Sequence, residues 1–381
     1  MIVGIVGAGQ LARMLALAGL PLGLRFVFLD PAADACAASL GEHLCGDYDD
    51  EALLAELARR ADVVTYEFEN VPETSIEFLS GHVSVFPGGE ALAVARDRLR
   101  EKNLFVRLGI PTPPFVAVDS LADLKCAVDR IGLPAVLKTR SLGYDGKGQA
   151  VLRRAEDIEA AWARLGDVPL ILEGFVNFRR EVSVIGVRGR DGGTAFYPLA
   201  ENVHHEGILR HSRACPSDPF QARAQEYLRA LFDDLAYVGV LALELFQVGD
   251  ELIANEMAPR VHNSGHWTIE GAETSQFENH LRAILGFPLG STHAVGHSAM
   301  VNFIGALPDP ARVLAMDGAH LHAYGKSARP GRKVGHATLR AQDEDSLRVA
   351  LLRLSRLSED DLLSLDETAV RCASGSGPRP P

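Results

Sequence analysis

The sequence predicts an α/β protein with α+β parts, because its first 90 residues alternate short apolar strands with helical stretches. Such alternation is typical of a parallel, doubly wound sheet, the core of a Rossmann-like domain. Two further observations extend the prediction: the strand pattern resets after a proline-rich linker, and a glycine-rich loop then joins two strands. A chain of 381 residues is long enough for several domains with their own cores.

The first domain carries a familiar turn. Its predicted strands are MIVGIVG, RFVFLD, DVVTYEFE and VSVFPG, with helices near 10–20, 50–60 and 73–80. The turn Gly7-Ala8-Gly9, with Asp30 about twenty residues later, matches the G-x-G-x-x-A fingerprint of dinucleotide-binding domains. Alone, this motif predicts an NAD-dependent oxidoreductase, so the rest of the chain has to decide.

The later segments divide the chain further. One helix is predicted over ARDRLREKNLFVRLG, and IPTPPF is an extended linker because proline excludes a helix. A small unit follows with strands FVAV, PAVLKTR, QAVLRR and PLILEGFV, and a larger one with REVSVIGVRG, GTAFYPLAE, GVLALELFQV and ELIANEMAPR. HLHAYGK, KVGHATLRA and a helix near 343–356 come last. The domain prediction is therefore 1–95, 96–172, 173–305, 306–372 and a disordered tail at 373–381.

Composition excludes several classes of protein. The net charge of −12 opposes binding to a phosphate backbone, so no nucleic-acid partner is expected. Five scattered cysteines without a CxxC pair indicate reduced thiols, and no apolar run reaches the ~18 residues of a membrane span. We expect a cytoplasmic protein without a membrane partner.

The densest chemical signal is the loop KTRSLGYDGKGQAV at 138–151. Glycines let backbone N–H groups turn onto a phosphate, and Lys147 adds a charge. Lys138 lies in an apolar strand, where a lysine is poorly placed unless an anion meets it. The alternative is a flexible hairpin with an unremarkable lysine.

A second signal is a pair of acidic residues on neighbouring strands around the turn Gly249-Asp250. A three-residue loop would place Glu244 opposite Glu256, whereas a two-residue loop would pair Glu244 with Asn255. Opposed carboxylates repel unless a cation lies between them, and Mg²⁺ prefers such oxygen ligands. The alternative is an exposed acidic face.

Two more segments carry charge or hydrogen-bonding groups. In RVHNSGHWT, His262 and His266 have the spacing of a helical zinc pair, but the segment lacks the glutamate of H-E-x-x-H and forms helices poorly. Further on, four cations stand within eight residues: Lys326, Arg329, Arg332 and Lys333. In an acidic chain this cluster suits one phosphate monoester, the alternative being a solvated basic loop.

The lysine loop followed by Glu and Asn-Glu on adjacent strands resembles the ATP-grasp superfamily. The ordered segments GAGQLARML, TYEFENVP, ARDRLREK, LGYDGKGQ, RVHNSGHWT and RPGRKVGH resemble the N5-carboxyaminoimidazole ribonucleotide synthases of purine biosynthesis, over the whole chain except the tail. The resemblance implies an ATP-grasp fold with an N-terminal Rossmann-like domain and a small C-terminal subdomain. It also implies an ATP-dependent ligase that makes carboxyphosphate from ATP and bicarbonate and carboxylates 5-aminoimidazole ribonucleotide.

The same resemblance implies the nucleotide site. The ATP-binding residues would be Arg98, Lys138, Gly143, Gly146, Lys147, Gly148, Glu173, Gly174, Phe175, Val176, Glu181, His204, Asn255 and Glu256. Glu244 and Glu256, with Asn255, would hold Mg²⁺. The loop would close over the β- and γ-phosphates, and Leu142 departs from the family's usual glycine there.

It implies the substrate site as well. The ribonucleotide and bicarbonate would be bound by Gln10, Leu11, Glu67, Arg260, His262, Asn263, Lys326, Arg332 and Lys333. The catalytic residues would be Tyr144, Asp145, Lys147, Arg260, His262 and Lys326. The Gly7–Leu11 turn would then face the ribonucleotide's phosphate, and Asp30 would merely end a strand.

The partners so implied are small molecules and, from the family, a second copy in a homodimer. Three other classes stay open: a sister ATP-grasp ligase such as formate-dependent glycinamide ribonucleotide transformylase, an NAD-dependent oxidoreductase, and a non-catalytic nucleotide-binding protein. A biotin carboxylase is disfavoured because the chain lacks that family's longer C-terminal domain.

Overall fold

The computed structural model describes residues 1–141, 143 and 147–357. Its N-terminal domain is a four-stranded parallel sheet with the order β3-β2-β1-β4, as the alternating pattern predicts. The elements are β1 (Ile2–Val6), α1 (Gln10–Gly19), η1 (Leu20–Leu22), β2 (Arg25–Asp30), η2 (Ala38–Leu40), β3 (Glu42–Cys45), α2 (Glu51–Arg60), β4 (Val63–Tyr66) and α3 (Glu73–Ser80). The predicted strand VSVFPG is wrong: Val85 makes only an isolated bridge to Val64, and Pro87 follows it without an N–H to extend the ladder.

The helix predicted over ARDRLREKNLFVRLG is present, but it begins three residues later than predicted, because two helices meet in that segment. These are α4 (Gly89–Arg96) and α5 (Arg98–Arg107). Asp97 between them is extended, and its carboxylate accepts hydrogen bonds from the amides of Leu99 and Arg100. An aspartate in this position caps a new helix start and so interrupts the helical run.

The small unit after the proline-rich linker is an antiparallel four-stranded sheet with the order β5-β8-β6-β7. Two helices pack on it through an apolar cluster. The elements are β5 (Phe115–Val118), α6 (Leu121–Ile131), β6 (Ala135–Thr139), β7 (Gln149–Leu152), α7 (Asp157–Leu165) and β8 (Leu170–Gly174).

The largest sheet has nine strands, in the order β14-β13-β9-β11-β12-β15-β17-β16, with β10 paired to β9. Its strands up to the long hairpin are β9 (Arg180–Arg188), β10 (Thr194–Phe196), β11 (Leu199–His205), β12 (Ile208–Cys215), β13 (Gly239–Val248) and β14 (Glu251–Ala258). GTAFYPLAE, predicted as one strand, is two, β10 and β11, because Pro198 interrupts the ladder. The helices along this stretch are α8 (Gln221–Asp234), η3 (Asn263–Gly265), α9 (Thr268–Gly271) and α10 (Gln276–Leu285).

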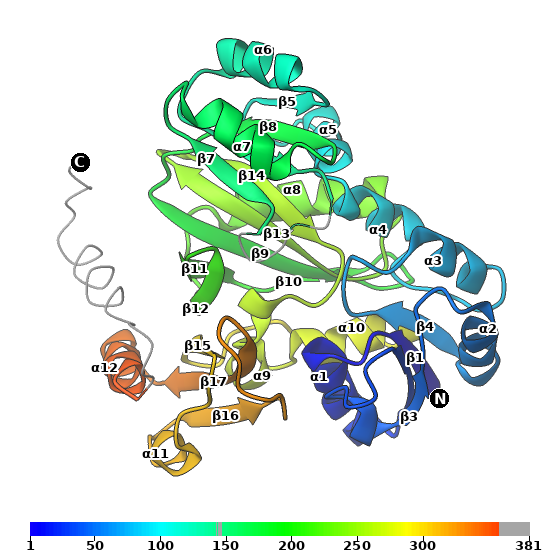
Figure 1. The fold of residues 1–381 in the computed structure, drawn as a ribbon. Coiled ribbons are helices and arrows are strands. Elements are labelled where there is room, and N and C mark those ends of the chain that lie inside the picture. The colour runs from blue at the N-terminus through cyan, green and yellow to red at the C-terminus, as the bar shows by residue number, and fades with distance from the viewer. Residues whose placement is uncertain (142, 144–146, 358–381) are drawn as a thin grey trace.

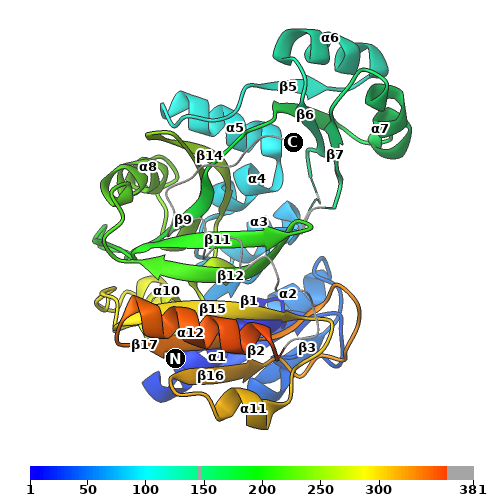
Figure 2. The same ribbon diagram turned by 90° about the vertical axis from the view of Figure 1, so that its left-hand side faces the viewer.

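The C-terminal strands do not form a sheet of their own. They are β15 (His297–Ile304), β16 (Ala319–Ala323) and β17 (Lys333–Ala341), with helices α11 (Pro310–Leu314) and α12 (Glu344–Ser355). Because β15 pairs with both β12 and β17, residues beyond 305 continue the large sheet (Figure 2). The predicted tail at 373–381 lies outside the described residues.

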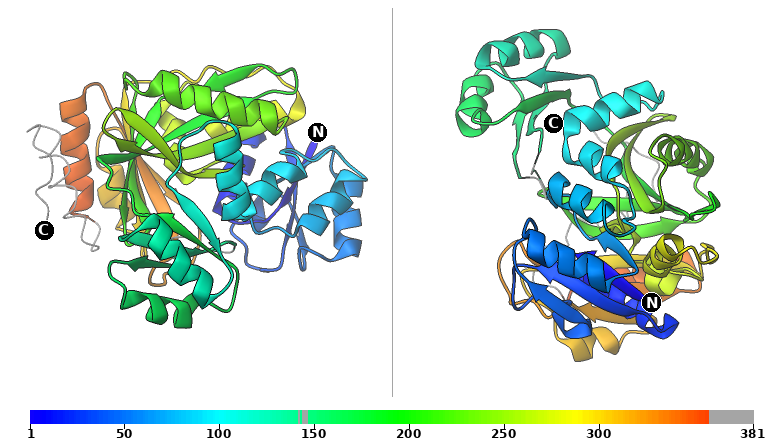
Figure 3. Two further views of the ribbon diagram at one scale, coloured as in Figure 1. Left: turned by 90° about the horizontal axis from the view of Figure 1, so that it is seen from above. Right: turned by 90° about the vertical axis from the view of Figure 1, so that its right-hand side faces the viewer.

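The N-terminal domain and the small α6–α7 unit lie at opposite ends of the molecule, with the large sheet between them (Figures 1 and 3). One buried cluster joins α1 of the N-terminal domain to α10 and the strands of the large sheet. This shared core fixes the N-terminal domain against the large sheet. Within the described part of the chain, no helix has the length and apolar character needed to cross a membrane.

Candidate active site

A cavity of about 760 Å³ opens where the three parts of the molecule meet. Its lining comes from the turn after β1, the end of β4, the small sheet, the β13–β14 hairpin, the segment after β14 and the start of β17. Most residues predicted to bind a ligand line it: Gln10, Leu11, Glu67, Arg98, Lys138, Gly143, Lys147, Glu173, Gly174, Phe175, Val176, Glu181, His204, Glu244, Asn255, Glu256, Arg260, His262, Asn263 and Lys333.

At the end of the cavity predicted to bind a nucleotide, Lys138 and Glu173 face each other on the neighbouring strands β6 and β8. The Lys138 Nζ lies 3.0 Å from a Glu173 carboxylate oxygen, and the buried Lys102 reaches the same oxygen at 3.4 Å. Burial opposes ionisation of Glu173, but the two lysines outweigh it and lower the pKa of the carboxyl. The other oxygen, Oε1, is buried with no hydrogen-bond partner among the described residues. An ionised carboxylate with a free acceptor in a cavity is suited to a ribose hydroxyl.

The glycine-rich loop is held at its base by Arg98. This guanidinium donates to the carbonyls of Thr139 and Gly143 and lies 3.7 Å from the Glu256 carboxylate. Gly148 has φ +71°, a conformation that favours glycine, and a Cβ there would lie 2.7 Å from the Thr139 hydroxyl. Leu142, Tyr144, Asp145 and Gly146 lie outside the described residues, so their predicted roles stay predictions.

An apolar wall completes the nucleotide end. Phe178 and Phe246 stack with their ring centroids 4.7 Å apart, and both line the cavity beside Val136. Next to them Glu181 and His204 form an ion pair at 2.7 Å. Burial lowers the pKa of His204, but Glu181 outweighs it and the net shift is upward.

The β13–β14 hairpin places Glu244 opposite Glu256, as predicted for a three-residue loop, but its turn and register match neither of the two predicted arrangements. The turn has two residues, since Val248 pairs with Glu251, yet the register shifts between Glu244 and Leu245 and restores the Glu244–Glu256 pairing. The extra residue is Asn255, which forms a bulge. Lys102 donates to the carbonyls of Ala254 and Asn255, at 3.3 and 2.5 Å. A buried ammonium thus satisfies the carbonyls at the irregular position.

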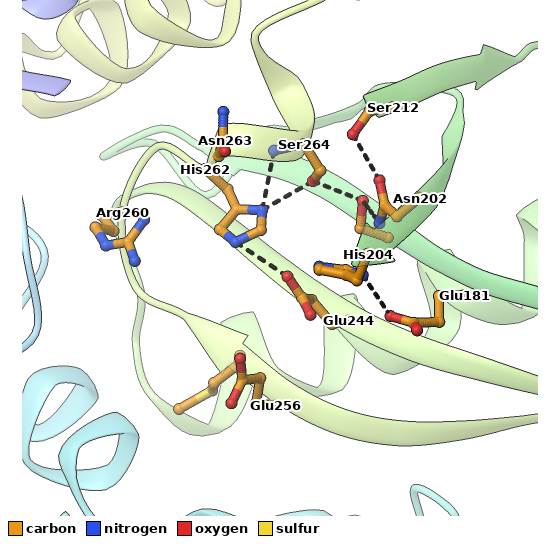
Figure 4. A network of polar contacts seen from close by, with 12 residues as sticks. Glu181, Asn202, His204, Ser212, Glu244, Glu256, Arg260, His262, Asn263 and Ser264 are labelled. Carbon is orange, nitrogen blue, oxygen red and sulfur yellow. Dashed lines mark hydrogen bonds and ion pairs between the residues drawn. The ribbon is translucent and has the colours of Figure 1, made fainter. Parts of the chain in front are cut away.

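Arg260 and His262 lie in the segment that follows β14, and both line the cavity. Arg260 is tied to Glu69 at 2.6 Å, which links the large sheet to the loop after β4. The Nε2 of His262 lies 3.1 Å from the Glu244 carboxylate (Figure 4). Burial opposes ionisation of Glu244, but the contact with His262 outweighs it and lowers the pKa of the carboxyl.

Asn263 lines the cavity but its amide is already engaged. It exchanges two hydrogen bonds with the amide of Asn302 on β15, at 3.1 and 2.7 Å. This reciprocal pair joins the segment after β14 to the C-terminal strands.

The Gly7-Ala8-Gly9 turn corrects one expectation. The amides of Gly9 and Ala12, at the start of α1, donate to the buried carboxylate of Glu67. Asp30 does more than end a strand, since it accepts from the amide of Ala8 and from the Tyr48 hydroxyl, both at 2.9 Å. Internal carboxylates therefore occupy the amides that a dinucleotide pyrophosphate would need, and the use of this turn by the ribonucleotide's phosphate stays a prediction.

At the substrate end, the basic cluster divides. Lys333 lines the cavity, and Lys326 contacts the Gln10 side chain in the cavity wall. Burial lowers the pKa of Lys326. Arg332 instead donates to the Ser327 hydroxyl at 2.8 Å on the exposed side of the loop, and it does not line the cavity.

Sequence reasoning missed the supporting residues. Glu69 lies within the segment TYEFENVP, and Lys102 lies within ARDRLREK. A lysine on the buried face of a predicted helix is unusual, and this signal could have indicated Lys102. Phe178 and Phe246 lie far apart in sequence, and nothing local indicates that they stack.

Comparison with known proteins identifies the family. The ribonucleotide synthetase preATP-grasp domain matches residues 1–96, the ATP-grasp domain matches 103–277, and the phosphoribosylaminoimidazole carboxylase C-terminal domain matches 298–349. The N5-carboxyaminoimidazole ribonucleotide synthase of Pseudomonas aeruginosa is 59% identical over 94% of this chain and 99% of its own length.

Solved structures agree. The N5-carboxyaminoimidazole ribonucleotide synthetase of Thermus thermophilus is 57% identical with a TM-score of 0.90, covering 94% of this chain and 99% of its own. The Aspergillus clavatus enzyme, solved with ADP and 5-aminoimidazole ribonucleotide, is 31% identical with a TM-score of 0.87, covering 96% and 98%. With such relatives along almost its whole length, the chain belongs to the N5-carboxyaminoimidazole ribonucleotide synthase family of ATP-grasp ligases.

Proposed function

We propose that this chain carboxylates 5-aminoimidazole ribonucleotide to N5-carboxyaminoimidazole ribonucleotide, using ATP and bicarbonate, in purine biosynthesis. The observation that carries the proposal is the single cavity. It joins an ATP-grasp nucleotide end, with Lys138 and Glu173, to a second end lined by Gln10, Glu67 and Lys333. A ligase that transfers a group activated by ATP needs both ends in one enclosed space.

The nucleotide end binds and orients ATP. Glu173 accepts from a ribose hydroxyl through its free oxygen, while Phe178 and Phe246 provide an apolar surface for the base. Lys138 and Arg98 present positive charge to the phosphates, and the loop from Gly143 to Gly148, of which 144–146 lie outside the described residues, is predicted to cover them. Covering the phosphates excludes the water that would hydrolyse carboxyphosphate.

Glu244, Glu256 and Asn255 would hold Mg²⁺. The fit is chemical: these are oxygen donors on two paired strands, and half of the Glu256 side chain is exposed beside the cavity. The described residues contain no group of three His, Cys, Asp or Glu side chains preset for a metal, so phosphate oxygens would complete the site. When bound, the ion neutralises phosphate charge as the phosphoryl group moves.

Bicarbonate would bind beside the segment that follows β14. Arg260, fixed by Glu69, and His262, fixed by Glu244, both present N–H groups to an oxyanion. An oxygen of bicarbonate attacks the γ-phosphorus of ATP and ADP leaves, which gives carboxyphosphate. The amine of the aminoimidazole then forms the N–C bond and loses a proton, either by displacing phosphate from the carboxyl carbon or by attacking CO2 after phosphate has left. Lys326 and Lys333 hold the phosphate monoester of the ribonucleotide and thereby place its amine.

The test is ADP release from MgATP and bicarbonate, with and without 5-aminoimidazole ribonucleotide. The proposal expects ADP formation that depends strongly on the ribonucleotide, together with a carboxylated product. ATP turnover indifferent to the ribonucleotide would refute it and redirect the search to glycinamide ribonucleotide with formate.

Two finer proposals concern the setting of the enzyme. A cytoplasmic location is supported by the free thiols of Cys36, Cys45, Cys126 and Cys215. A homodimer is proposed from the family resemblance, and sedimentation at several protein concentrations tests it.

A further inference from the structure

A chain of buried hydrogen bonds runs from β12 to the cavity and ends on His262 (Figure 4). The Ser212 hydroxyl donates to the Asn202 amide oxygen at 2.7 Å, and the Asn202 amide nitrogen donates to the Ser183 hydroxyl at 3.1 Å. Ser183 donates to the Ser264 hydroxyl at 2.7 Å, and that hydroxyl lies 2.8 Å from the Nδ1 of His262. All four residues before His262 are buried.

The direction of this chain follows from counting hydrogens. A serine hydroxyl has one hydrogen to donate. Ser183 accepts from Asn202, and its one hydrogen is used in the bond to Ser264. Ser264 then has its own hydrogen left for the Nδ1 of His262.

Two groups that can act only as a donor or only as an acceptor lead independently to the same assignment, an unprotonated Nδ1 and a protonated Nε2. The backbone amide of Ser264 points at Nδ1 from 3.3 Å, with His262 as the capping residue of the short helix η3. A backbone N–H can only donate, so Nδ1 must accept. On the other side of the ring, Nε2 faces the Glu244 carboxylate at 3.1 Å, and an ionised carboxylate can only accept.

The His262 backbone is held as well. Gln276 accepts from the His262 amide at 2.9 Å and donates to its carbonyl at 2.6 Å. Turning the ring over would place Cδ2 against the Ser264 amide and Cε1 against Glu244, so only the observed orientation satisfies both contacts.

We propose that Ser264 and Ser183 are positioning residues that hold His262 as the neutral tautomer with its hydrogen on Nε2. The inference rests on the proposed function for its consequence. At the cavity His262 then has one hydrogen to donate, which faces Glu244 in this structure and would go to the oxyanion derived from bicarbonate in place of Glu244; His262 is not the general base. A proton released during carboxylation cannot be taken by Nε2, which already carries one.

The tautomer is measured directly by nitrogen NMR of the protein labelled with ¹⁵N-histidine, with His262→Gln used to assign the signal. We expect a protonated Nε2 and an unprotonated Nδ1. A hydrogen on Nδ1, alone or in an imidazolium, overturns the proposal. This readout needs no substrate, so it stands whether or not the proposed reaction is found.

The hydroxyl chain is tested with Ser264→Ala and a matched control, Ser298→Ala. Ser298 is a buried serine of the large sheet whose hydroxyl has no hydrogen-bond partner among the described residues. Ser264→Ala keeps the backbone amide and Glu244, so we expect the hydrogen to stay on Nε2, the Nδ1 signal to shift because it loses the hydroxyl, and kcat to fall roughly 3- to 10-fold with little change in the KM for ATP. The control should show the wild-type ring signal. A wild-type signal in Ser264→Ala would remove the hydroxyl from the positioning role.

The donor role is tested by comparing His262→Gln with His262→Ala. Glutamine keeps an N–H donor but provides no base. We expect its rate to exceed that of the alanine variant by about tenfold or more, because removing an oxyanion donor costs on the order of 10²-fold. Equal rates in the two variants would refute the donor assignment.

Discussion

Lys102→Met removes the ammonium that lies behind the nucleotide site while keeping most of the side-chain volume. Lys102 is 1% exposed and contacts three acceptors: the carbonyls of Ala254 and Asn255 at 3.3 and 2.5 Å, and the Glu173 carboxylate at 3.4 Å. Burial lowers the pKa of Lys102, and Glu173 opposes that shift. The ammonium therefore connects the bulge of β14 to Glu173, the carboxylate proposed to bind the ribose.

The magnitude follows from what the variant leaves behind. Removing one member of a buried charge pair typically costs about 3–5 kcal/mol. Glu173 keeps Lys138 at 3.0 Å, so the lower end, about 3 kcal/mol of unfolding free energy, is expected. Two carbonyls also lose their donor, which shifts Asn255 and Glu256. We expect kcat/KM for ATP to fall about tenfold, equivalent to ~1.4 kcal/mol.

The assay is urea unfolding with and without ATP, together with ATP kinetics. Lys125→Met is the matched control, since Lys125 forms an exposed pair with Glu159 at 3.0 Å and should contribute only about 0–1 kcal/mol. If the two variants unfold at the same urea concentration and keep the same KM for ATP, the assigned role of Lys102 is refuted.

Three further predictions address the metal, the substrate and pH. Glu256→Gln should abolish magnesium-dependent turnover, because a ligand carboxylate is lost; near-normal rates over a range of MgCl₂ concentrations would remove Glu256 from the metal site. Lys326→Ala should raise the KM for the ribonucleotide about tenfold or more and leave that for ATP nearly unchanged; equal effects on both would contradict its place at the substrate end. Burial lowers the pKa of His280 to about 3, and its Nδ1 accepts from the Val240 amide. Its neutral form therefore stabilises the fold above the ordinary pKa of 6.5, and this contribution is lost as pH falls toward 3. His280→Gln should accordingly lose less unfolding free energy than the wild type between pH 6.5 and 4, and parallel curves would exclude the assignment.

The sequence predicts well those features that depend on neighbouring residues. The parallel N-terminal sheet follows from strand–helix alternation, and the linker follows from its prolines. The family, and with it the ATP-grasp fold, follows from six short segments in a fixed order. Most residues implied by those segments line one cavity, which supports their grouping.

Prediction is wrong where one residue changes the local geometry. Asp97 lies within an otherwise helical run and starts a second helix by capping it. Asn255 forms a bulge, so a two-residue turn still places Glu244 opposite Glu256. The helix start and the bulge both depend on side chains that hydrogen-bond to backbone groups. Such bonds compete with the regular helix or strand that residue propensities predict.

The supporting residues of the site are hard to predict for a different reason. Ser183, Asn202 and Ser212 are polar residues on buried strands, where periodicity alone assigns them to no function. They become informative only when the sheet places β9, β11 and β12 side by side and behind the segment that carries Ser264. The hydrogen-bond direction then passes from strand to strand to one imidazole nitrogen. The sequence thus predicts which groups would contact substrates, whereas for His262 the topology supplies the donors that set the proposed position of its hydrogen.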